Sequence, residues 1–442
     1  MSKSRMVLSS FFVVLFLLFF VALWSRKNNE HSLIRCAKCN VLFISVDTLR
    51  ADHAGFMGYQ KNTTPNIDIL ASKSFVFTNT RAVSSWTLPS TMSWFTGVYP
   101  SRHGVTNKIV FVGNKEASAS ISLTAPNLTT LAQVFQSQGY NTAAFTGGAG
   151  LNHDFGFNKG FQTYKDDVDF AGFSKTGPQT IQWLEKNKNY PFFIFLHGYD
   201  VHGQHIPEGG YDKRYVDFLY TGKLTGDKEE QKQLREDGLE KGSVYLTKED
   251  VRFLTALYDE KINRADSFLG EIFSYVKQNN LDQSTVIILT SDHGEEFYEH
   301  GRIDHGNTLY DEIIRVPLVI HIPNNMPEKN NVPASGIDLF PTILDAIEIK
   351  TQNIENQFNG ISLFSDGIKK RKTQFSETQY RYAVDIKSVV KGDKKFIQDE
   401  DKQKHELFNL FLDPREQKNV FQSFEKNEDT IDLNNTINQI LQ

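Results

Sequence analysis

Three stretches of the sequence place an acid or a histidine directly after a short apolar run. Asp47 follows residues 40–46, His197 ends a second run, and Asp292 and His293 follow a third. Such runs are typical of strands buried on both faces of a parallel sheet, and ligands bind beyond the carboxyl ends of such strands. Helix-cap or turn roles would account for any one of these residues, but less well for the set. The pattern predicts a metal-competent site containing Asp47, Asp292 and His293, with His197 nearby.

A hydroxyl side chain lies at a predicted helix start in residues 85–100. Pro89 suits the first turn of a helix, so Thr87 is placed at a helix N-terminus, where free amides and the dipole favour an anion. A hydroxyl beside a divalent cation becomes more acidic, and the same cation neutralises charge on a phosphoryl or sulfuryl oxygen. Thr87 is therefore a candidate nucleophile.

The elements that position these residues alternate between strands and helices. Residues 254–278, for example, carry apolar side chains close to helical spacing. This alternation predicts an α/β fold with a large, mostly parallel central sheet covered by helices. Residues 208–250 are charged and Gly-rich, which is typical of a surface insertion, and short β-like pieces predict a small C-terminal α+β subdomain. We expect a catalytic domain at 40–365, this subdomain at 366–422 and a tail at 423–442.

The N-terminal region predicts a membrane anchor. Residues 6–24 carry no charge and are long enough to cross about 30 Å of hydrocarbon. A cleaved signal peptide is the alternative, although no clear small-x-small cleavage site follows. We expect an anchor or signal peptide in residues 1–27 and a stem in 28–39. The catalytic domain is then expected outside the cytoplasm, at a bacterial inner membrane, in a periplasm or at the cell surface.

Composition excludes several classes of protein. The 442 residues include 48 Lys and Arg against 53 Asp and Glu, so no basic excess exists to neutralise a nucleic-acid backbone. We expect no nucleic-acid partner. Two Cys cannot make a disulfide scaffold, and Cys36 with Cys39 lacks the second pair that a zinc site would need. A local disulfide and an inert thiol pair both remain open.

The motifs taken together resemble the sulfatase family of the alkaline phosphatase superfamily. The family's nucleophile motif is in register with Thr87, Pro89 and Ser90, followed by Thr-Gly at 96–97 and Tyr-Pro at 99–100. Further similar segments, in order, are residues 47–52, 64–68, 197–202, 291–295, 305–306, 310–317, 338–342 and 407–416. The resemblance covers nearly all of residues 40–420 and implies an alkaline-phosphatase-like sandwich.

The resemblance also implies a metal site. Asp47, Asp292 and His293 would bind one divalent metal ion, with Thr87 bridging to it as the nucleophile. Imidazole in this set favours zinc or manganese, and calcium remains possible.

Other residues acquire substrate roles from the same resemblance. His202 would hold a substrate oxygen or help the leaving group, and His305 would contact the transferring group. Arg50 is a further expected anion contact. For His197, His205 and His300, ordinary polar or capping roles account for the sequence at least as well.

Departures from the family pattern decide the expected chemistry. Formylglycine forms from Cys or Ser, so Thr87 is not expected to yield it. Thr91 stands where the family usually has an arginine, and Thr48 stands where it has the second acid of the Asp-Asp pair. His293 takes the place of the asparagine that often follows the later metal aspartate. A Thr nucleophile with an Asp-His pair resembles the superfamily's phosphodiesterases, phosphoglycerol transferases and phosphoethanolamine transferases.

The expected function is therefore a metal-dependent hydrolase or transferase of sulfate or phosphate esters. It would act through a covalent Thr87 intermediate, with phosphoesters or phosphonates preferred. A true sulfuric ester hydrolase is the first alternative, and a catalytically inactive sulfatase-like binding protein is the second.

Overall fold

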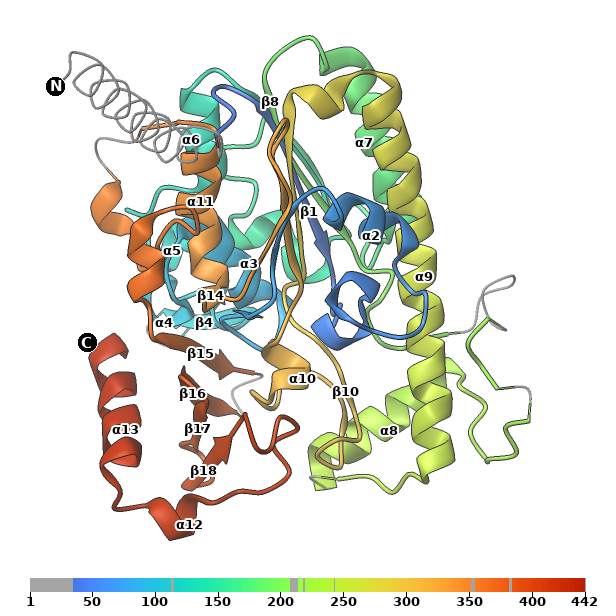
Figure 1. Ribbon diagram of the computed structural model, residues 1–442, viewed down its shortest axis with the longest axis vertical. Helices are drawn as coiled ribbons and strands as arrows, with labels where there is room; N and C mark the ends of the chain where they lie inside the picture. Colours follow the sequence, from blue (N-terminus) through green and yellow to red (C-terminus); the bar gives the residue numbers. More distant parts are fainter. Residues whose placement is uncertain are drawn as a thin grey trace, which may run out of the picture.

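A computed structural model describes residues 35–112, 115–206, 214–217, 219–241, 243–350, 354–380 and 384–441. Its centre is an eight-stranded sheet with the order β13-β2-β12-β9-β1-β8-β6-β7 (Figure 1). The three central strands are β9 (Thr285–Thr290), β1 (Asn40–Val46) and β8 (Phe192–Gly198). The outer strands are β13 (Glu328–Asn330), β2 (Phe75–Phe77), β12 (Leu318–His321), β6 (Asn141–Phe145) and β7 (Thr163–Lys165).

The central strands are apolar along their whole length because both faces of the sheet are covered. In β1 every residue after Asn40 is buried. Val41 pairs in parallel with Phe193 on one side and with Val286 on the other. The sheet is mixed, since β12 runs antiparallel to both β9 and β2.

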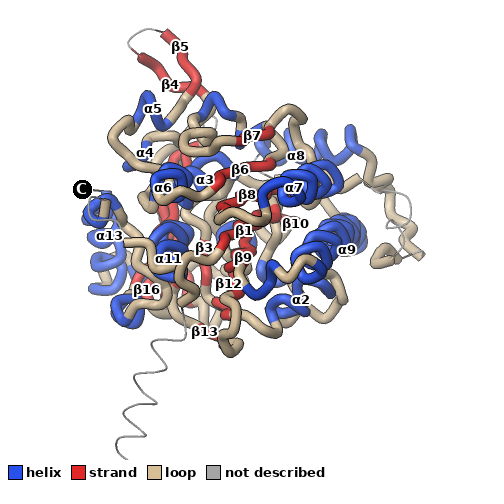
Figure 2. Tube along the Cα trace, turned by 90° about the horizontal axis from the view of Figure 1, so that it is seen from above, coloured by secondary structure: helices blue, strands red, loops and turns tan. Residues whose placement is uncertain are grey.

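Helices cover the two faces, as the view along the sheet shows (Figure 2). On one face lie α2 (Pro65–Ala71), α7 (Phe173–Asn187) and the long α9 (Lys248–Gln278). On the other lie α3 (Thr87–Thr96), α6 (Leu131–Ser137) and α11 (Leu339–Ala346). Alternate residues of β1 serve the two cores: Phe43 packs against Trp94 of α3 with ring centroids 5.4 Å apart, while Ile44 belongs to the core beneath α9.

Short elements and one longer helix complete the catalytic domain. The longer helix, α8 (Lys228–Lys241), lies in the predicted surface insertion beside α9 (Figure 1). The short elements are β3 (Thr80–Arg81), α4 (Pro100–His103), β4 (Ile109–Val112), β5 (Lys115–Ser118), α5 (Ile121–Thr124), β10 (Glu296–Phe297), β11 (Ile303–Asp304), α10 (Asp311–Ile314) and β14 (Ala334–Ser335).

The C-terminal region forms a second, antiparallel sheet of four strands. The strands are β15 (Thr373–Gln379), β16 (Asp385–Lys391), β17 (Lys394–Asp399) and β18 (Lys404–Asn409), and two helices follow, α12 (Phe421–Phe424) and α13 (Glu428–Leu441). The expected tail at 423–442 thus contains a packed helix, because Leu433 and Ile437 of α13 are buried against Val389 and Phe396. The domain boundaries proposed from the sequence stay a prediction.

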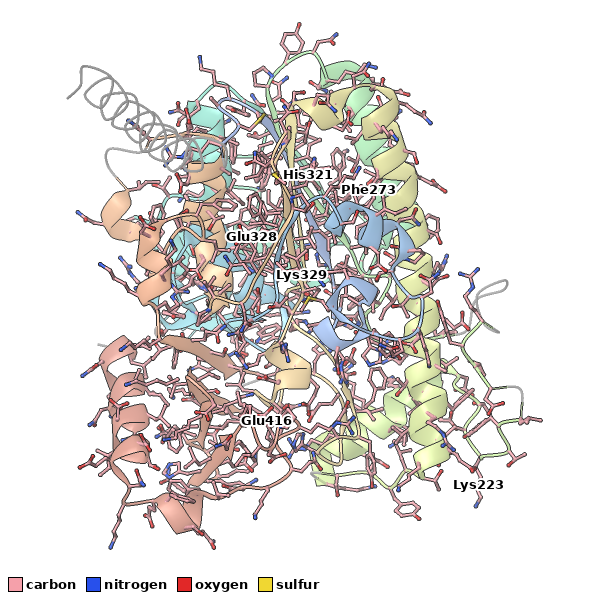
Figure 3. All side chains as sticks on the ribbon, in the orientation of Figure 1. Lys223, Phe273, His321, Glu328, Lys329 and Glu416 are labelled. Carbon is pink, nitrogen blue, oxygen red and sulfur yellow. A yellow bond between two sulfur atoms is a disulfide. The ribbon has the colours of Figure 1, made fainter. Side chains whose placement is uncertain are left out.

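A buried ion network joins this sheet to the catalytic domain. Lys395 of β17 is fully buried, and its ammonium lies 2.9 Å from an Asp311 oxygen and 2.7 Å from a Glu416 oxygen. Arg81 binds the other oxygen of Asp311 at 2.7 Å. Figure 3 labels Glu416 at this border between the two parts.

The predicted fold class requires a correction at the N-terminus. In the part of the chain that the structure describes, no helix is long and apolar enough to cross a membrane. The predicted span at residues 6–24 lies outside the described residues. Within the described residues the fold class is corrected to an α/β fold with a large mixed sheet. In the predicted stem, Cys36 and Cys39 are joined by a disulfide.

Candidate active site

Thr87 is the first residue of α3, as the position of Pro89 predicted. Trp86 before it is extended, so the chain turns into the helix at Thr87. The Thr87 hydroxyl donates a hydrogen bond to Asp47 Oδ2 at 3.2 Å, and its oxygen, Oγ1, lies 3.4 Å from His293 Nε2. The candidate nucleophile therefore contacts two of the three predicted metal ligands.

The two carboxylates meet because their strands are neighbours. Asp47 follows β1 and Asp292 follows β9, and both side chains are fully buried. One oxygen of each, Asp47 Oδ1 and Asp292 Oδ2, has no hydrogen-bond partner. Ligand atoms of Asp47, Asp292 and His293 all lie within 4.8 Å of one another. Unpartnered oxygens buried this deeply are costly, and a bound cation would satisfy them. This donor set fits a divalent metal ion.

His293 presents a defined nitrogen to this cluster. Its Nδ1 donates to the Gly294 carbonyl at 2.9 Å, so Nε2 is the nitrogen with the free lone pair. Gly294 allows the backbone of residue 312 to pass close by, since a Cβ at position 294 would lie 2.1 Å from the Glu312 carbonyl oxygen. The same Nε2 lies 3.4 Å from Asp292 Oδ2.

The pKa shifts of Asp47 and Asp292 are consistent with a cation-binding site. Burial, and then repulsion by Asp292, raise the pKa of Asp47 well above its ordinary value. Burial also acts to raise the pKa of Asp292, but the charges of His293 and His197, together with hydrogen bonds from Thr87 and Thr48, lower that pKa. A divalent ion between the two carboxylates would favour the ionised form of both.

The backbone after β1 is held in an uncommon conformation. Thr48 has φ 54°, which is rare for a β-branched residue and costs of the order of 1–3 kcal/mol. The Tyr258 hydroxyl donates to the Thr48 carbonyl at 2.7 Å and accepts from the Arg50 amide at 2.8 Å. In this conformation the Thr48 amide reaches Asp292 Oδ1 at 3.3 Å. Strain at this position thus coincides with the predicted metal site.

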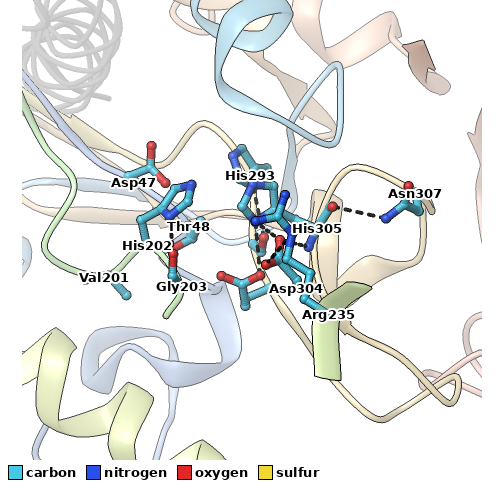
Figure 4. Close-up of polar contacts among 12 residues, drawn as sticks. Asp47, Thr48, Val201, His202, Gly203, Arg235, His293, Asp304, His305 and Asn307 are labelled. Carbon is cyan, nitrogen blue, oxygen red and sulfur yellow. Dashed lines mark hydrogen bonds and ion pairs between the residues drawn. The ribbon is translucent and has the colours of Figure 1, made fainter. Parts of the chain in front are cut away.

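Figure 4 shows His202 and His305 near Asp47 and His293. His202 donates from Nδ1 to the Gly203 carbonyl at 2.5 Å, and burial lowers its pKa. Its neutral ring therefore offers Nε2 as an acceptor. The ring of His305 lies 5.0 Å from that of His202 and 4.4 Å from that of His293. The ring of His305 thus lies against those of His293 and His202.

Two other residues considered from the sequence, His197 and Arg50, lie in different surroundings. His197 lies within the cluster, with Nε2 3.2 Å from Asp47 Oδ2, and burial lowers its pKa to about 4. Arg50 is directed elsewhere, since its guanidinium binds Asp52 at 2.8 Å and Glu299 at 2.6 Å. Its role as an anion contact stays a prediction without support from this geometry.

Three further residues at the site were missed. Glu295 Oε1 accepts from His305 Nδ1 at 3.0 Å, and Asp304 Oδ1 lies 3.1 Å from the same nitrogen. Arg235 of α8 in turn binds Asp304 Oδ2 at 3.1 Å. Glu295 was visible in the sequence as part of a motif that also holds Asp292 and His293. Arg235 carried no such signal, because it lies within a charged insertion.

The fold and site together define a metal-competent α/β enzyme domain, and sequence comparison identifies its family. The sulfatase model matches residues 39–349, and the model "N-sulphoglucosamine sulphohydrolase, C-terminal" matches residues 298–442. The chain belongs to the sulfatase family of hydrolases. This confirms the resemblance drawn from the motifs.

Individual relatives are distant. Iduronate 2-sulfatase of Homo sapiens is 28% identical over 375 residues, which cover 72% of this chain and 64% of that protein. The uncharacterized sulfatase YidJ of Escherichia coli (strain K12) is 23% identical over 356 residues, covering 71% and 69%. The phosphonate monoester hydrolase of Agrobacterium radiobacter has a similar fold, with a TM-score of 0.69 at 19% identity, over 91% of this chain and 95% of that one.

Proposed function

We propose that this chain is a metal-dependent hydrolase that cleaves phosphate or phosphonate esters through a covalent intermediate on Thr87. The observation that carries this proposal is the position of the Thr87 hydroxyl, 3.2 Å from Asp47 and 3.4 Å from His293 at the start of α3. Asp47, Asp292 and His293 would hold one divalent ion, with zinc or manganese favoured over calcium by the imidazole ligand. When bound, such an ion neutralises charge on the transferring group.

The chain's own residues would divide the chemistry as follows. The Thr87 oxygen attacks phosphorus as the bond to the ester oxygen breaks, and Asp47 Oδ2 is the nearest acceptor for the Thr87 proton. Nε2 of His202 carries no proton in the neutral ring, so His202 would take up a proton before donating it to the leaving ester oxygen. His305, fixed by Glu295 and Asp304, would contact the transferring group. Water then attacks the phosphoryl-Thr87 adduct, which releases phosphate or phosphonate and restores the hydroxyl.

The residue type at position 87 supports phosphorus over sulfur. A formylglycine hydrate can release sulfate by elimination from its geminal diol, whereas the Thr87 adduct must be resolved by direct attack of water or of an acceptor alcohol. The second candidate is sulfate-ester hydrolysis, which family membership favours. Relatives described as sulfatases and a structural neighbour described as a phosphonate monoester hydrolase are compatible with either.

The test is a panel of 4-nitrophenyl esters given to the full chain loaded with zinc or manganese. We expect kcat/KM for a phosphate diester or a phosphonate monoester to exceed that for the sulfate. The Thr87→Val variant keeps the shape but lacks the hydroxyl, and should lose about 10³-fold or more in turnover. The matched control is Thr96→Val, at the far end of the same helix. Efficient sulfate hydrolysis with negligible phosphoester turnover would favour the second candidate instead.

Location outside the cytoplasm stays a proposal. Its support is the Cys36–Cys39 disulfide, a bond that persists mainly in oxidising compartments. Labelling of intact cells with a membrane-impermeant protein reagent would test it.

A further inference from the structure

A cleft of about 640 Å³ opens at His202. It is much larger than a phosphate or sulfate group, so it has room for a sizeable leaving group. Its walls come from the loop after β8 and from helices α8 and α9. Five cationic side chains line it, and Asp200 is the one carboxylate among its lining residues. The cations are Lys228, Lys232 and Arg235 of α8 and Lys261 and Arg264 of α9.

Helix α8 is fixed in place by two polar side chains that point inward. Gln231 accepts from the His205 amide at 2.8 Å and donates to the His205 carbonyl at 3.1 Å. Arg235 binds Asp304, next to His305, and Figure 4 shows this pair beneath the His305 ring. The helix is thus attached to both loops that carry the catalytic histidines.

The exposed lysines of α8 share the face that lines the cleft. Lys228, Lys232 and Arg235 are spaced by four and three residues, which places them on one side of the helix. Lys228 and Lys232 are exposed, and neither makes an ion pair within the described residues. On the opposite wall, burial raises the pKa of Asp200, while Arg264 and Lys261 act to lower it. Among the lining residues, five cationic side chains thus accompany one carboxylate.

The aromatic ring of Phe170 lines the cleft beside His202. Phe170 is 56% exposed, and its ring lies 5.1 Å from His202 and 5.3 Å from Tyr199. An exposed Phe beside a catalytic histidine offers a flat apolar contact for the part of the leaving group next to the ester oxygen.

We propose that the cleft between α8 and α9 is a leaving-group subsite that selects esters whose leaving group carries additional anionic groups. This inference rests on the proposed function, because it takes His202 as the residue at the ester oxygen. Lys228 and Lys232 would bind the outer anions, and the partly buried Arg235 would position the helix. The recognised chemistry is a multiply charged anion, whether its charges are carboxylate, sulfate or phosphate.

Equilibrium binding tests the subsite without relying on turnover. The metal-loaded Thr87→Val protein is titrated with benzene-1,3,5-tricarboxylate, sucrose octasulfate and inositol hexakisphosphate, and with benzoate as the singly charged reference. The test variant is Lys228→Ala/Lys232→Ala, and the control is Lys186→Ala/Lys277→Ala, which removes two exposed lysines elsewhere. We expect at least one polyanion to bind more tightly than benzoate. We expect its Kd to rise about tenfold in the test variant, roughly threefold per exposed lysine, and to stay unchanged in the control.

The three polyanions distinguish the source of the charge, and ester turnover in the parent protein keeps the two proposals separate. Equal Kd values in test and control variants, or no preference over benzoate, would overturn the subsite while active ester turnover upheld the proposed function. Lysine-dependent polyanion binding together with no turnover of any ester would refute the proposed function and leave an anion-binding cleft.

Discussion

His300 should give the folded protein a stability that depends on pH. Its Nδ1 donates to Glu312 Oε1 at 2.6 Å and its Nε2 donates to the Glu416 carbonyl at 3.0 Å. A ring that donates from both nitrogens is an imidazolium. Burial on its own would lower the pKa of His300, but the hydrogen bond and charge of Glu312 raise it to about 9. The hydrogen bond from His300 to the Glu416 carbonyl connects the loop after β10 to the C-terminal region.

The size and sign of the effect follow from linkage. A pKa that rises from 6.5 in the unfolded chain to about 9 in the folded one corresponds to about 3 kcal/mol. The side chain is 13% exposed, so screening by water lowers our expectation to about 2 kcal/mol. Because the folded pKa is the higher one, the stabilisation is fully present below pH 6.5. It is lost as the pH rises through about 9.

Thermal unfolding of His300→Gln and of the parent protein between pH 6 and pH 10 measures this pH-dependent stabilisation by His300. We expect the variant to melt about 2–3 °C lower at pH 6 and the two curves to converge near pH 10. The control is His153→Gln, whose ring pairs with Asp166 at an exposed position. A melting difference that is the same at every pH, or that grows as the pH rises, would refute the reasoning.

Three further predictions follow from single side chains. Asp292→Asn should lose bound metal, measured by elemental analysis, together with turnover, while its circular dichroism spectrum stays unchanged. The exposed control Asp167→Asn should keep its metal content. Full metal content in Asp292→Asn would contradict the ligand assignment. Lys395→Met should lower the free energy of unfolding by about 3–5 kcal/mol in urea, since Asp311 and Glu416 lose the buried ammonium between them; an unchanged urea midpoint would show that the network contributes nothing. Phe43→Ala should cost about 3–5 kcal/mol in the same assay because it empties a fully buried site beside Trp94, and a loss below 1 kcal/mol would mean that the core closes over the gap.

The sequence predicted the centre of the molecule well because the signals there are local and repeated. Three apolar runs ending in acids or histidines became three adjacent parallel strands, and this adjacency brings Asp47 and Asp292 together. Pro89 placed the start of α3 correctly. The family's nucleophile motif indicated the same residue, Thr87, which stays a prediction.

The parts that could not be predicted depend on contacts between distant segments. Arg50 carries the same charge whether it meets a substrate or Glu299, and only the folded loop decides between them. Residues 423–442 were expected to be a tail, yet Leu433 and Ile437 of α13 are buried on the C-terminal sheet. Arg235 reaches the site from an insertion whose composition indicates only a surface position. The roles of Thr87, His202 and His305 stay predictions.

The central claim is that Thr87 is the nucleophile, and trapping the adduct tests it most directly. The metal-loaded full chain is mixed with its best ester, quenched in acid within the first turnover and digested, and the peptides are analysed by mass spectrometry. The account predicts a phosphoryl or phosphonyl group on Thr87 of the peptide from the start of α3, and none in Thr87→Val. Rapid turnover with an unmodified Thr87 peptide, or an adduct on another residue, would contradict it.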